Sequence, residues 1–211
     1  ASDATRDLIV ERGQQDKDSE IGRFPRLFRA VESIPGLTWP TLTFPKQMSV
    51  WLGQREVRIM HIGRGHTAGD VVAYVPDANV VFSGDLVEYH SACYCGDAHF
   101  TDWPATLDRL AQFNAVALVP GRGAALGSPQ KVAEGIDMTR DFLSTLYGSA
   151  RDSVAKGLSL KQAFAAARQK VPPGTCGGTT VMVTSVLGKY QTTLGNCDGW
   201  MPGRRRRSDS A

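Results

Sequence analysis

Three short strings in this 211-residue chain place chemically capable side chains directly after apolar runs. His66 lies in GHTAGD, Asp85 in SGD and Arg122 in PGRG. Side chains at the ends of neighbouring strands can be held together over one cleft by a rigid sheet. Histidine and aspartate can ligate a metal ion or transfer protons, and arginine can bind an anion. Each string alone is typical of an ordinary turn, so the signal lies in their order and spacing.

In this order, GHTAGD, FSGD and VPGRG resemble the third, fourth and fifth motifs of the metallo-β-lactamase superfamily, in particular its glyoxalase II-like metallohydrolases. The resemblance implies that His66 is a metal ligand, that Asp85 is the carboxylate bridging two metal ions, and that both residues serve catalysis. It also implies zinc or another divalent transition metal as cofactor, with one or two ions in relatives. The implied reaction is hydrolysis of an ester, thioester or lactone of a small molecule by a metal-bound hydroxide.

Two departures from the family pattern reduce the implied metal site. The principal family motif, HxHxDH, does not occur in the chain, and Arg122 stands where the fifth motif has its histidine. A guanidinium stays protonated and has no lone pair to offer a metal. Only two ligands of the family set therefore remain, whereas a catalytic zinc needs about three. The sequence predicts a degenerate metal site, and it leaves open whether the chain holds a metal and is an active enzyme.

Two other functions compete with the hydrolase interpretation. The chain could be a non-catalytic remnant that binds a small anionic ligand or a protein partner. It could also be a metal-binding module, because the loop after Asp85 contains four zinc-compatible side chains at an unusual spacing, namely His90, Cys93, Cys95 and His99.

Two charged residues near Asp85 have alternative interpretations. Arg122 could anchor a substrate carboxylate or phosphate, or form a bidentate pair with Asp85 that replaces the second metal. Glu88 could contact the substrate or be a solvated charge.

The chain's periodicity predicts a mixed α/β fold. The expected elements are helix within 1–35 interrupted at Pro25, an antiparallel meander over 42–61 with a turn at Gly53-Gln54, strands at 71–75, 79–82 and 116–119, a loop at 86–101, and helices beginning after Asp102, Ser128 and Ser159. The resemblance implies the αββα sandwich of the superfamily, incomplete in its N-terminal half. We expect a partial domain over 1–173 and a divergent or disordered segment with an Arg-rich tail over 174–211.

Composition is that of an ordinary water-soluble domain, with 42% hydrophobic and 21% charged residues and no run that predicts a membrane span. Residues 204–211 account for the whole net charge of +3, so the charge is no argument for nucleic-acid binding. Four cysteines are few for a disulfide framework, which favours a cytoplasmic protein with reduced thiols. Because an incomplete sandwich exposes an apolar sheet surface, we expect a homodimer or a missing companion segment to cover it.

Overall fold

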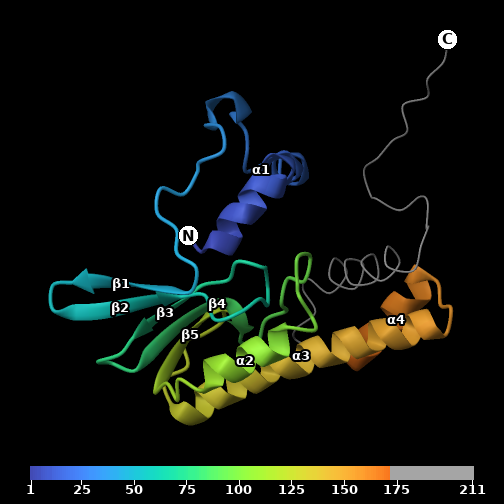
Figure 1. Ribbon diagram of the computed structural model, residues 1–211. Helices are drawn as coiled ribbons and strands as arrows, with labels where there is room; N and C mark the ends of the chain where they lie inside the picture. Colours follow the sequence, from blue (N-terminus) through green and yellow to red (C-terminus); the bar gives the residue numbers. More distant parts are fainter. Residues whose placement is uncertain (172–211) are drawn as a thin grey trace.

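The computed structural model describes residues 1–171, which form one five-stranded sheet and four α-helices (Figure 1). In chain order the elements are α1 (Asp3–Arg23), the short 3-10 helix η1 (Val31–Ser33), β1 (Gln47–Leu52), β2 (Arg55–Met60), β3 (Val72–Val75), β4 (Val80–Glu88), α2 (Trp103–Ala111), β5 (Ala117–Arg122), α3 (Pro129–Ala155) and α4 (Leu160–Lys170). None of the helices within residues 1–171 combines the length and apolar content of a membrane span.

The sheet has the simple order β1-β2-β3-β4-β5. Its first four strands pair antiparallel. The pairing of β1 with β2, in which Leu52 faces Arg55 across the turn at Gly53-Gln54, confirms the meander predicted within 42–61, although its first strand begins only at Gln47. β5 pairs parallel to β4, and α2 forms the crossover that a parallel pair requires. The parallel pairing brings the two motif-bearing strands side by side.

The helices α2 and α3 pack along one face of the sheet (Figure 1). Alternation along β4 turns Val81 into this core, where it is fully buried, and turns Phe82 to the opposite face, where it is 45% exposed. Phe82 belongs to a row of cross-strand partners on this face, to which each of the five strands contributes one residue: Met48, Ile59, Ala73, Phe82 and Val119. We call this apolar row and its neighbours Val50 and Leu52 the open face. Its exposure agrees with the expectation of an incomplete sandwich.

The N-terminal helix is shorter than predicted. α1 ends at Arg23, because Pro25 disfavours helical backbone at Phe24 (φ −124°, ψ 56°), and only η1 follows within the expected helical stretch. The start of α1 is tied to the middle of the chain. The Ser2 hydroxyl caps the helix through Thr5 and also donates a 2.9 Å hydrogen bond to the Gly69 carbonyl. This contact fixes the loop that carries His66.

The two motif strands are longer than predicted. The strands were expected to end at Phe82 and Val119, with a loop from residue 86, but β4 continues to Glu88 and β5 to Arg122. The reason is their mutual pairing, which runs past two register shifts to bring Glu88 opposite Arg122. Asp85 therefore lies within a strand rather than beyond its end.

The later helices agree with the sequence. Ser128 and Ser159 cap α3 and α4 through their side chains, and α3 ends at Ala155 as predicted. Asp102 precedes α2 as expected but makes no capping bond, because its carboxylate pairs with Arg64. The predicted C-terminal segment, 174–211, lies outside the described residues.

Candidate functional site

A loop held by internal hydrogen bonds, Gly65–Asp70, presents the candidate histidine. The Asp70 carboxylate accepts hydrogen bonds from the Thr67 backbone N–H (3.0 Å) and the Thr67 hydroxyl (2.7 Å). From outside, the Thr5 hydroxyl joins that of Ser2 in donating to the Gly69 carbonyl. The sequence reasoning missed the contribution of α1, because these contacts span more than 60 positions and leave no local pattern.

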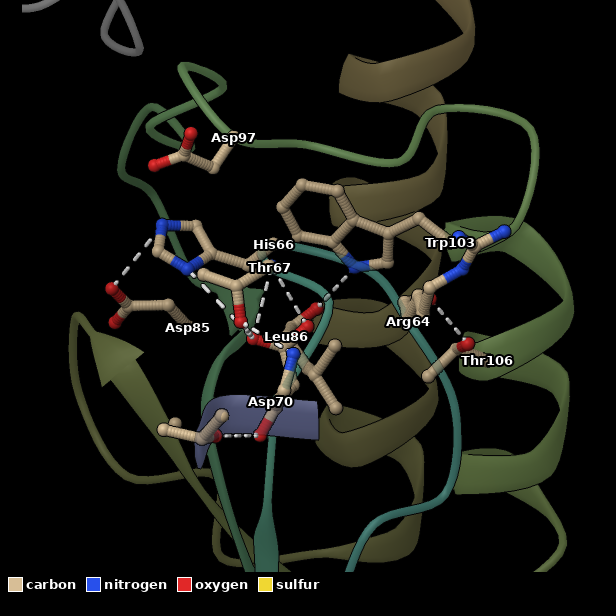
Figure 2. A network of polar contacts seen from close by, with 12 residues as sticks. Arg64, His66, Thr67, Asp70, Asp85, Leu86, Asp97, Trp103 and Thr106 are labelled. Carbon is tan, nitrogen blue, oxygen red and sulfur yellow. Dashed lines mark hydrogen bonds and ion pairs between the residues drawn. The ribbon is translucent and has the colours of Figure 1, made fainter. Parts of the chain in front are cut away.

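His66 points at Asp85 (Figure 2). Its Nε2 lies 3.6 Å from Asp85 Oδ2, and its ring is held between Tyr94 and the fully buried Trp103, with centroids 6.0 Å away in each case. Trp103 is itself fixed by a 3.1 Å hydrogen bond from Nε1 to the Leu86 carbonyl. Within the described residues, His66 Nε2 is buried and has no hydrogen-bond partner. An unpaired buried nitrogen aimed at a carboxylate is suited to receive a ligand or a proton.

Arg122 lies beside Asp85, but its hydrogen bond goes elsewhere. Its Nη1 donates a 2.6 Å hydrogen bond to Glu88 Oε1, whereas its Nη2 is 3.8 Å from Asp85 Oδ2. The predicted Arg122–Asp85 pair is therefore present as a 3.8 Å ion pair, but it is not bidentate, because the hydrogen bond of the guanidinium goes to Glu88. The β4–β5 register places Glu88 opposite Arg122, and this register was not readable from either motif.

Glu88 is only 2% exposed, so its interpretation as a solvated charge is wrong. Burial raises the pKa of Glu88 to about 7; the cation of Arg122 opposes this increase, and the anion of Asp85 adds to it. Its Oε2 is buried without a hydrogen-bond partner among the described residues. The site therefore contains a carboxyl group that can change protonation near neutral pH.

Gly121 allows β5 to approach Asp85 closely. A Cβ at this position would lie 2.8 Å from both the backbone N and the Cα of Asp85, closer than real contacts of this kind. Glycine is therefore required by packing, which accounts for one position of the PGRG string without any catalytic role.

The loop that follows β4 does not assemble a metal site. Cys93 and Cys95 are buried in the hydrophobic core, and burial raises the pKa of the Cys93 thiol well above its usual value. His90 instead packs its ring on Tyr89, with centroids 4.2 Å apart. Over residues 1–171 no three His, Cys, Asp or Glu side chains are grouped to hold a metal ion, so His99 also lies outside such a group. Since a thiol must ionise to ligate a metal, this environment disfavours the predicted module.

Comparison with known proteins shows which families this chain resembles in sequence and in fold. No family model matches the chain. The linear primary-alkylsulfatase of Pseudomonas sp. is 27% identical over 146 residues, which cover 66% of this chain and 27% of that protein. A metallo-β-lactamase type 2 of Bacteroides fragilis is 33% identical over 93 residues, covering 42% of this chain and 37% of that protein. The solved structure of the sec-alkylsulfatase Pisa1 from Pseudomonas sp. matches 73% of this chain and 27% of its own, with a TM-score of 0.58 and 18% identity.

The fold is that of the metallo-β-lactamase superfamily. The chain spans between 27% and 37% of the length of the relatives named above. The relatives named above are hydrolases of this superfamily, two alkylsulfatases and a β-lactamase, and the name of the β-lactamase states that it uses a metal.

The described part of this metallo-β-lactamase-fold chain does not by itself suit a tightly held metal ion. His66 and Asp85 converge, but the guanidinium of Arg122 approaches the same Asp85 oxygen and would repel a cation there. With two converging ligands, the donor set falls short of the three that a catalytic zinc uses. A complete metal centre would need at least one ligand from outside residues 1–171.

Proposed function

We propose that this chain is a hydrolase-like protein for small anionic ester-type substrates, in which the metal site of the superfamily is reduced to His66 and Asp85. The observation that supports this proposal is the position of His66 Nε2, which is buried, has no hydrogen-bond partner among the described residues and lies 3.6 Å from Asp85 Oδ2. These two groups can share or pass a proton, and either can orient a water molecule for attack. Arg122, 47% exposed at its side chain and steadied by Glu88, would anchor the anionic group of the substrate.

The substrate classes are esters, thioesters and lactones, as the superfamily resemblance implies. Sulfate esters join them because relatives are named as alkylsulfatases. A zinc or other divalent ion and a cytoplasmic location stay predictions. When bound, such an ion would supply an activated water.

The test combines hydrolysis with metal binding on the full chain. We expect slow release of nitrophenol from a nitrophenyl acetate or sulfate, lost in Asp85→Asn and kept in the matched control Asp77→Asn, whose carboxylate pairs with Arg55 at the exposed β3–β4 turn. Zinc titration of chelator-treated protein should give weak binding that also needs Asp85. Turnover that is absent in the wild type, or unchanged in Asp85→Asn, would contradict the proposal.

The non-catalytic alternative is favoured by one observation, the position of a guanidinium where a metal ligand is needed. In that case sulfate should bind without any turnover of its esters, and Arg122→Met should abolish the binding. The loop module makes a different prediction, since zinc binding would then survive Asp85→Asn and disappear in Cys95→Ser.

A further inference from the structure

A groove lies where the C-terminal end of β2 meets the C-terminal end of α2, and it is formed by residues other than His66 and Asp85. We call it the β2–α2 groove. Its volume is about 650 Å³, within the range of small-molecule sites. Met60, Ile62 and Phe113 give it an apolar wall, and all three pack against the hydrophobic core. Phe113 is further fixed by edge contact with Tyr74, at 4.9 Å between ring centroids.

The polar part of the groove has one sign of charge. Lys46, His61 and Arg109 line it, and none of the described lining residues is acidic. Among the ion pairs within residues 1–171, neither Lys46 nor Arg109 has a carboxylate partner. Two cations without a counter-ion beside an apolar wall favour a ligand that brings an anion of its own.

The Arg109 guanidinium is held in place at the groove. Its Nε donates to the Ile62 carbonyl, and its Nη2 donates a 3.0 Å hydrogen bond to Thr106 Oγ1. Gly63 makes this placement feasible, because a Cβ there would overlap the guanidinium. Two of the five guanidinium donors are used in this way, so others remain for a ligand. His61 donates from Nδ1 to the Asp70 carbonyl (2.7 Å), which fixes the orientation of its ring.

We propose that the β2–α2 groove binds a small amphiphile with an anionic head, such as a medium-chain carboxylate or alkyl sulfonate, taken up as a free monomer. The head would lie at Lys46 and Arg109, and the chain would lie along Met60, Ile62 and Phe113. This site goes beyond the proposed function and does not depend on it, since it uses neither His66 nor Asp85.

The test uses octane-1-sulfonate below its micellar range, with neutral octan-1-ol as the matched probe. Methyl-labelled methionines report the location, because Met60 lines the groove whereas Met48 lies on the open face. We expect a saturable shift of the Met60 signal with octane-1-sulfonate and weaker binding of octan-1-ol. Lys46→Met and Gln112→Glu should each raise the Kd for the sulfonate about fivefold, as loss or gain of one surface charge would, with little effect on octan-1-ol. The control Lys161→Met, an exposed lysine on α4, should leave both affinities unchanged.

Three outcomes would overturn the proposal. Shifts of Met48 without Met60 would place the ligand on the open face. Equal affinity for the two probes would show that charge plays no part, and an equal weakening by Lys46→Met and Lys161→Met would show that the charge at the groove is not what binds the sulfonate. Binding to vesicles of anionic phospholipid, without binding of the free sulfonate, would mean that these cations meet a lipid surface instead. Because hydrolysis is not the readout, failure here leaves the proposed function untouched.

Discussion

Replacing Glu88 by glutamine is expected to stabilise the protein at pH 8 and to change its stability little at pH 4.5. The side chain is buried, and burial raises its pKa from an ordinary value of 4.5 to about 7. The folded state therefore holds the Glu88 proton over a pH range in which the unfolded chain has released it. Stability is greatest below about pH 4.5 and is lost as pH rises through about 7, which amounts to about 3 kcal/mol in the free energy of unfolding.

Arg122 sets how large this loss is. In Arg122→Met the buried Glu88 would lose its 2.6 Å partner and its pKa would rise further above 7, so Glu88 would stay protonated at pH 8 and the further loss should be about 1.4 kcal/mol, the free energy of one pH unit. At pH 4.5 the same change should cost much less, because Glu88 is then protonated and neutral. The contrast between the two pH values distinguishes loss of a charge partner from a simple packing defect.

The assay is urea unfolding from pH 4.5 to 8, with EDTA present so that no metal contributes, followed by tryptophan fluorescence. Glu32→Gln, an exposed carboxylate in η1, is the matched control and should follow the wild type at every pH. An identical pH dependence in Glu88→Gln and the wild type would refute the reasoning. So would an Arg122→Met cost that is the same at both ends of the range.

Two further predictions concern packing and association. Gly121→Ala should lower the free energy of unfolding by about 1–3 kcal/mol and impair the Asp85 site, because the new methyl group would press on the Asp85 backbone. Gly127→Ala is the control and should have neither effect, because the space around its Cβ is open. Denaturation and binding assays on the two variants check this. The open face predicts self-association of the full chain, so light scattering should report a dimer or larger species that Phe82→Lys weakens; a monodisperse wild-type monomer would contradict it.

Much of the fold could be predicted from local sequence. The meander follows from the period-two alternation around Gly53-Gln54, and the beginnings of α3 and α4 follow from Ser128 and Ser159, since turns and caps are decided by neighbouring residues. The limits of β4 and β5 could not be predicted in this way. A strand continues for as long as it finds a pairing partner, and the partner of each lies more than 30 positions away.

For the candidate site, too, the sequence predicted some features and long-range contacts decided the others. Sequence alone identified His66, Asp85 and Arg122, and it determined that the chain lacks the HxHxDH string and offers an arginine where the family has a ligand. Only the tertiary structure decided that Arg122 gives its hydrogen bond to a buried Glu88 and reaches Asp85 through a longer, 3.8 Å ion pair. It also decided that Cys93 and Cys95 enter the core instead of facing a metal. Residue type fixes which chemistry is available, but burial and distance, which set pKa and pairing, arise only when distant strands are brought into register.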